Sequence, residues 1–135
     1  MYKNILVPVA FDHDRDTSEA LNIAHTLAAE GAKITALHVM DEVPSYVAQY
    51  LPEGRLEDNR AELEARLKAD VGGLKNVKAV VISGHPGHSI NEYAKDNGVD
   101  CIVVASHRPG IQDFFLGSTA ARVVRHAPCS VHVSR

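Results

Sequence analysis

Short apolar runs alternate with helix-forming segments along all 135 residues, and this alternation constrains the fold more than any other feature. The apolar runs are rich in Val, Ile and Leu. Because they are continuous rather than alternating with polar residues, they predict strands that are buried on both faces. They occupy residues 5–9, 34–40, 77–82, 100–105 and 130–133. Strands of this kind need helices on both sides, so the pattern predicts a parallel sheet with right-handed helical crossovers.

Four segments with helical spacing lie between these runs, at residues 16–28, 56–71, 86–97 and 118–126. Gly31 is placed to end the first helix. In the second helix, the pairs Glu62–Arg66 and Glu64–Lys68 have the spacing of helical ion pairs. The order of elements predicts an α/β fold: a doubly wound, Rossmann-like, five-stranded parallel sheet with helices on both faces, in one domain that spans residues 1–135.

The composition is typical of a soluble globular protein, and the sequence predicts that this protein is cytoplasmic. The formal net charge of −3 argues against a nucleic-acid binder. No apolar run approaches the roughly 20 residues of a membrane span, so we expect no membrane insertion. Residues 1–7 lead directly into a strand, without the features of a signal peptide. Two cysteines, Cys101 and Cys129, are too few for a disulfide framework, and they read as small buried hydrophobic residues.

Basic residues gather near the end of the chain. Residues 105–135 contain four arginines and one acid, namely Arg108, Arg122, Arg125, Arg135 and Asp113, whereas the other 104 residues contain 10 basic and 16 acidic side chains. A positive segment in an acidic protein indicates a site for a small anion rather than for a polyanion. The alternative is that the arginines are simply solvated on a helix and a tail.

The position of this segment supports an anion site. In a doubly wound sheet, ligands bind beyond the carboxyl ends of the strands where the strand order reverses. We therefore expect the loops after the first and fourth strands, residues 10–12 and 105–117, to lie side by side. Gly117 allows close approach of an oxyanion, while Ser118 and Thr119 add hydroxyl donors at a helix N-terminus that has no carboxylate in its first turn. Alternatively, Ser118 caps its own helix.

Other kinds of site are less well supported. The chain has neither a G-x-x-x-x-G-K-[ST] nor a G-x-G-x-x-G motif. A receiver-type site is weakened because the third strand ends in Ser83-Gly84 rather than in an aspartate. His85 and His88 have no third ligand at a clear spacing, so no metal site is predicted. His38 reads as a hydrogen-bonded core histidine.

Four stretches of the sequence carry a family resemblance: "NILVPVA", "ALHV", "GHPGHSINEYA" and "VVASHRPGIQDFFLGSTAARVVRHAPCSVHV". Through them the chain resembles the universal stress proteins over essentially its whole length. The nucleotide-binding branch of that family has a G-x-x-G-x9-G-[ST] signature. Here Ala105 and Arg108 replace the first two glycines, and eight residues separate Arg108 from Gly117. The loop is similar to a variant with an S-H-R-P sequence. Ala10 replaces the family's strand-1 aspartate.

The resemblance implies an adenine-nucleotide alpha hydrolase-like domain that binds ATP, with or without Mg²⁺ or Mn²⁺, and acts as a cytoplasmic stress-response sensor or regulator. Residue patterns and resemblance together predict the nucleotide-binding residues Pro8, Val9, Ala10, Val39, Val104, Ala105, Ser106, His107, Arg108, Gly110, Gly117, Ser118 and Thr119. His107 is expected to contact phosphate or ribose, and the backbone of Val39 to face the adenine. No catalytic residue is predicted.

Activity and assembly follow from the same reasoning. No general base is identifiable beside the loop, so ATP hydrolysis or autophosphorylation should be very slow or absent. The last strand, residues 130–133, should lie at the open edge of the sheet without proline or lysine to block pairing. The resemblance implies a homodimer through this strand; the sequence names no further protein partner. The alternatives are a slow ATPase or autophosphorylating switch, with Ser118 or Thr119 as acceptor, and a nucleotide-free dimeric scaffold.

Overall fold

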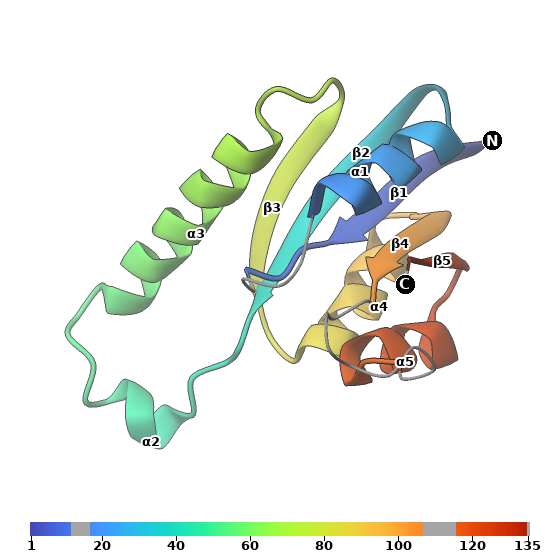
Figure 1. Ribbon diagram of the computed structural model, residues 1–135. Coiled ribbons are helices and arrows are strands. Elements are labelled where there is room, and N and C mark those ends of the chain that lie inside the picture. The colour runs from blue at the N-terminus through green and yellow to red at the C-terminus, as the bar shows by residue number, and fades with distance from the viewer. Residues whose placement is uncertain (12–16, 107–115, 135) are drawn as a thin grey trace.

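The predicted five-stranded parallel sheet is confirmed. The computed structural model describes residues 1–11, 17–106 and 116–134. The strands are β1 (Tyr2–Pro8), β2 (Ala28–Met40), β3 (Val77–Ser83), β4 (Cys101–Ala105) and β5 (Ser130–Ser134). They lie in the order β3-β2-β1-β4-β5, and all neighbouring pairs are parallel (Figure 1). The strand order reverses between β1 and β4, so the carboxyl ends of these two strands are where a ligand crevice is expected.

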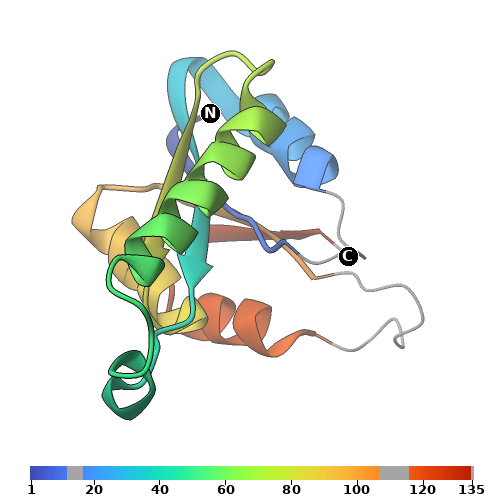
Figure 2. The ribbon, with the colours of Figure 1, turned by 90° about the vertical axis from the view of Figure 1, so that its left-hand side faces the viewer.

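The helices are α1 (Thr17–Leu27), α2 (Ser45–Ala48), α3 (Arg55–Val71), α4 (Pro86–Asp96) and α5 (Ser118–His126), and all but α2 cover the faces of the sheet. Helices α1 and α3 pack on one face, and α4 and α5 pack on the other (Figure 2). None of the helices in the described part of the chain combines the length and the apolarity that a membrane crossing requires.

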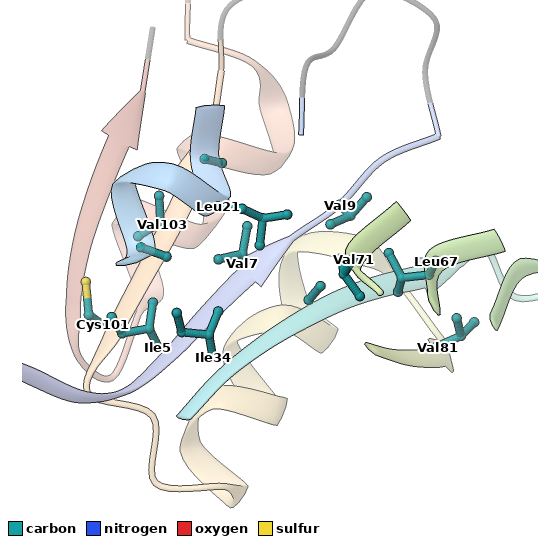
Figure 3. Close-up of a cluster of buried hydrophobic side chains, with 13 residues drawn as sticks. Ile5, Val7, Val9, Leu21, Ile34, Leu67, Val71, Val81, Cys101 and Val103 are labelled. Carbon is teal, nitrogen blue, oxygen red and sulfur yellow. The ribbon is translucent and has the colours of Figure 1, made fainter. Parts of the chain in front are cut away.

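Successive residues of the central strand β1 supply the two halves of the core. Ile5 and Val7 join a cluster with α1 and α3, to which Leu67 also belongs (Figure 3). Leu6, between them, joins the opposite cluster together with Ile90 of α4. Because side chains alternate across a strand, an uninterrupted apolar run buries both faces of the sheet at once.

The expected role of Gly31 as the end of the first helix is wrong. Strand β2 already begins at Ala28, which pairs with Tyr2. The next recorded pair joins Asn4 to Lys33, so β2 contains extra residues in between, and Gly31 lies among them with φ +77°. Pairing with β1 ends the helix early, and the glycine accommodates the irregular backbone that restores the register.

The connection between β2 and α3 contains the short helix α2. One of the two ion pairs expected in α3 forms, with Lys68 Nζ 3.2 Å from Glu64 Oε1. Arg66, expected to pair with Glu62, instead places its guanidinium carbon 4.5 Å from the centre of the Phe11 ring.

The two glycines at the start of α4 have structural reasons. Gly84 adopts φ +154°, and a β-carbon there would collide with the hydroxyl of Ser89. A β-carbon on Gly87 would lie 2.7 Å from Cδ of Arg122, so this glycine allows α4 and α5 to pack closely. The "GHPG" stretch therefore sets how α4 begins and how it meets α5.

Candidate functional site

The structure brings the described parts of the predicted site to one end of the sheet. Pro8 and Ala10 lie where β1 ends, and Ala105 and Ser106 lie where β4 ends. Strands β1 and β4 are neighbours, with Leu6 opposite Ile102. Residues 117–119 begin α5 and are tied to the end of β4 by a hydrogen bond. These segments frame the crevice at the point where the strand order reverses.

Ser106 is the anchor of this arrangement. Its side chain is buried, and its Oγ accepts a hydrogen bond of 3.2 Å from the backbone N–H of Gly117. Its own backbone N–H donates to the carbonyl of Ser134 at 2.8 Å. Ser106 thus joins the end of β4 to the start of α5 and to the end of β5. The predicted site residues His107, Arg108 and Gly110 lie outside the described residues.

Helix α5 begins without a side-chain cap. Its N-cap residue is Gly117, and Ser118 is the first helical residue, so the alternative in which Ser118 caps the helix is wrong. Gly117 has φ −57°, which any residue can adopt, and a β-carbon there would meet only Ser106 Oγ at an ordinary 3.9 Å. Within the part of the chain that the structure describes, neither backbone nor packing requires a glycine at position 117. With no acidic residue in the first turn, the unpaired N–H groups and helix dipole suit an anion.

The three valines predicted for the site lie at or near the carboxyl ends of β1, β2 and β4. Val9 and Val104 are buried, and Val39 packs against the core on the α4 side of the sheet. The backbone of Val9 is already engaged, because its N–H donates to the carbonyl of Leu37 at 2.7 Å and its carbonyl accepts from His38 Nδ1 at 2.8 Å. The expected hydrogen-bonded role of His38 is therefore confirmed.

Sequence reasoning did not anticipate a stack beside the crevice. The Phe11 ring contacts both the His38 ring, with 4.5 Å between ring centres, and the guanidinium of Arg66, which lies over it. The stack holds the segment after β1 against β2 and α3. No periodic signal could have revealed it, because it joins a loop, a strand and a helix that are far apart in the sequence.

The two thiols offer no nucleophile to the site. Burial, with the neighbouring Cys129 thiol and the Asp100 carboxylate adding to it, raises the pKa of Cys101 from 9.0 to about 11. Burial and Asp100 also raise the pKa of Cys129. Both thiols therefore stay protonated at neutral pH, and the protonated form is the unreactive one. Cys101 also starts β4 and so lies at the opposite end of the sheet from the crevice.

The two histidines at the start of α4 form no metal site with other described residues. His85 is the N-cap residue of α4, and His88 Nε2 lies 3.3 Å from Glu92 Oε2. Among the residues that the structure describes, no three His, Cys, Asp or Glu side chains gather closely enough to hold a metal ion.

A parallel sheet with this strand order defines a Rossmann-like α/β protein. In this chain the N-terminus of α5, which has no side-chain cap, lies where the strand order reverses. The chain belongs to the universal stress protein family, whose family model matches residues 1–135.

Relatives and solved structures agree with this assignment. The chain is 31% identical to a universal stress protein of Thermus aquaticus and 32% identical to universal stress protein G of Escherichia coli O157:H7, with both chains covered completely in each case. Among solved structures, universal stress protein UspA from Lactobacillus plantarum is 30% identical, with a TM-score of 0.68 over 99% of this chain and 98% of that one.

Three more distant structures share the fold and hold an adenine nucleotide. A universal stress protein in complex with cAMP has a TM-score of 0.69 at 19% identity, covering 99% of this chain and 97% of that one. The universal stress protein from Archaeoglobus fulgidus in complex with dAMP has a TM-score of 0.68 at 18% identity, covering 99% of this chain and 98% of that one. A universal stress protein family protein from Arabidopsis thaliana with AMP bound has a TM-score of 0.63 at 19% identity, covering 98% of this chain and 90% of that one.

Proposed function

We propose that this protein binds an adenine nucleotide, with ATP as the first candidate, in the crevice between β1 and β4. On this proposal it acts as a nucleotide-dependent sensor or regulator in the stress response. The observation that carries the proposal is the start of α5. Gly117 stands where neither the backbone nor packing against the described residues needs a glycine, and the first turn has no side-chain cap and no acidic residue. Close approach of a phosphate explains all three properties. The nucleotide complexes of other members of the fold support the choice of ligand.

The proposed pose follows the geometry of the crevice. The phosphates lie at the N–H groups and hydroxyls of Ser118 and Thr119 and meet the guanidinium of Arg108. The nucleoside extends across the ends of β1 and β2, between Ala10 and Val39. The phenyl ring of Phe11 already contacts His38 and Arg66, so we place it as a fixed wall rather than as a base-stacking partner.

Two measurements on the purified protein test the proposal. Mass spectrometry of the supernatant after heat denaturation is expected to detect an adenine nucleotide. Isothermal titration of the stripped protein with ATP and with AMP, each with and without Mg²⁺, is expected to give saturable binding at one site per chain. If no adenine nucleotide binds under any of these conditions, the nucleotide-free scaffold replaces our proposal.

Arg108→Ala should weaken ATP binding by about 1.5–3 kcal/mol, the value of a charge-assisted hydrogen bond, which is roughly a 10- to 150-fold rise in Kd. Arg125→Ala is the matched control, because Arg125 is an exposed arginine in the last turn of α5, at the end away from the crevice. Isothermal titration measures both variants. Equal affinities of wild type and Arg108→Ala would exclude Arg108 as a phosphate ligand.

We also propose that the protein forms a homodimer through β5. This strand is at the edge of the sheet, as expected, and a groove of about 610 Å³ between it and α1 is lined by His132 and Asn22, among others. The carbonyl of Ser134 bonds back toward β4, so by the alternation of a strand the backbone groups of Val131 and Val133 point outward. Outward N–H and C=O groups are available to a second copy.

Val131→Pro tests this dimer, because it removes one outward donor and leaves the inward bonds of its neighbours to β4 intact. We expect the variant to shift toward monomer in sedimentation velocity at micromolar concentration, while Val131→Ala, which keeps the donor, should behave like the wild type. A wild type that is monomeric with and without ATP would refute pairing through β5.

A further inference from the structure

The first feature without a role is an arm formed by residues 41–54, which includes α2. No residue of α2 is buried, and Tyr46 and Tyr50 are 70% and 82% exposed. In both ribbon views α2 projects away from the sheet and from α5 (Figures 1 and 2). Two solvent-exposed aromatic side chains on a projecting segment indicate an interaction surface.

The arm is also acidic. It contains Asp41, Glu42 and Glu53 but no lysine or arginine, so 14 residues carry a formal charge of −3. A surface that receives the arm should therefore be basic, and it should offer room for at least one aromatic ring.

A groove of this kind lies between α4 and α5. Its volume is about 430 Å³, and it is lined by His88, Asn91, Glu92, Lys95, Arg122, His126 and Pro128. Lys95 and Arg122 supply positive charge, and α5 contains no acidic residue. The acid of the groove, Glu92, is paired with His88. The groove is thus complementary to the arm in charge, and its volume lies in the range of clefts that receive ligand groups.

The side-chain oxygen of Asn91 lacks a hydrogen-bond donor within the described part of the chain. The residue is only 9% exposed, and its Oδ1 is buried with no hydrogen-bond partner among the described residues. Its Nδ2 makes one long hydrogen bond, 3.4 Å to the carbonyl of Arg122. A buried amide oxygen without a donor is unfavourable. A tyrosine hydroxyl is the kind of donor it lacks, because tyrosine combines an apolar ring with a polar tip.

We propose that the arm of one molecule docks into the α4–α5 groove of a second copy of this chain, with Tyr46 or Tyr50 inserted toward Asn91 and the arm's carboxylates beside Lys95 and Arg122. The contact joins different molecules because the arm and α5 lie apart within one chain in both views. It is independent of nucleotide binding and of β5, so it adds a second mode of association. The groove and the arm are different surfaces, so the contact is head-to-tail and can link more than two copies.

Sedimentation velocity in a Val131→Pro background, where pairing through β5 is removed, tests the contact. The weight-average mass is expected to rise with concentration at low salt and to fall in 0.5 M NaCl, because charges drive the encounter. Tyr46→Ser with Tyr50→Ser should weaken the association at least about tenfold, as expected for the loss of aromatic anchors. Both side chains are exposed, so the fold should be unaffected. Unchanged association in this double variant would overturn the proposal.

A charge exchange provides the specific control. One variant reverses the charges of the arm (Asp41→Lys, Glu42→Lys, Glu53→Lys), and another reverses the two basic side chains that line the groove (Lys95→Glu, Arg122→Glu). Neither should self-associate, whereas their mixture should, because each arm then meets a groove of opposite charge. A mixture that stays monomeric contradicts the arm–groove pairing.

A photo-cross-linker identifies the contact directly. The probe p-benzoylphenylalanine at position 50 should form cross-links to peptides from residues 86–96 or 118–128 of another molecule, recognised by mixing ¹⁴N- and ¹⁵N-labelled protein. The same probe at the exposed position 30 is the control. Cross-links that stay within one chain, fall elsewhere or do not form would overturn the proposal.

Discussion

Replacing Leu67 with alanine is expected to lower the free energy of unfolding by about 2–5 kcal/mol, the range for deleting a buried leucine side chain and leaving a cavity. Leu67 is 0% exposed and packs in the cluster formed by α1, α3 and the sheet (Figure 3). Because α3 also carries Arg66, which lies over Phe11, loosening this helix should disturb the wall of the proposed nucleotide crevice as well.

Urea denaturation followed by circular dichroism measures the loss, with Leu56→Ala as the matched control. Leu56 lies in the same helix but is 42% exposed, so its truncation should change the free energy by only about 0.5 kcal/mol. Equal losses for the two variants would mean that α3 does not pack on the sheet through Leu67.

Raising the pH from 9 to 11 is expected to remove about 2 kcal/mol of stability through Cys101, the larger part of a total that amounts to about 1.4 kcal/mol for each unit of pKa difference. The pKa of this thiol is 9.0 in an exposed chain and about 11 in the folded protein. Below pH 9 the thiol is protonated in both states, so the contribution is fully present. Above pH 9 the unfolded chain releases the proton first and is favoured, and the loss is complete once the pH has passed the folded value.

The pH dependence of Cys101→Ala isolates this effect. Its overall stability will be lower because a buried side chain is truncated, so the quantity to compare is the slope of unfolding free energy between pH 9 and 11. We expect the slope of the variant to be shallower than that of the wild type, since lysines and tyrosines titrate in both. Parallel slopes would show that Cys101 is not buried as a neutral thiol.

Much of the candidate site could be predicted because it depends on local patterns. The apolar runs determine the strands, and their alternation with helices places the carboxyl ends of β1 and β4 beside one another. Gly117, Ser118 and Thr119 were recognised from the turn and hydroxyl chemistry of a helix start. What the pattern could not decide was which residue caps α5: Ser118 was a plausible cap, and only the backbone geometry shows that Gly117 holds this position.

Other features depended on contacts between distant residues. The helix α1 ends before Gly31 because β1 takes the chain into the sheet from Ala28 onward, a pairing that outweighs the local glycine signal. Arg66 contacts Phe11 rather than its expected helical partner, because the segment after β1 packs against α3 and presents an aromatic face to it.

The sequence by itself determined the class of fold and the family, because hydrophobic periodicity and short motifs are properties of neighbouring residues. Only the tertiary structure decided that Ser106 ties β4 to α5, that Gly87 lets Arg122 pack closely, and that the buried Asn91 oxygen has no partner among the described residues. These depend on the close approach of side chains that are distant in the chain, and such distances arise only when the helices settle on the sheet.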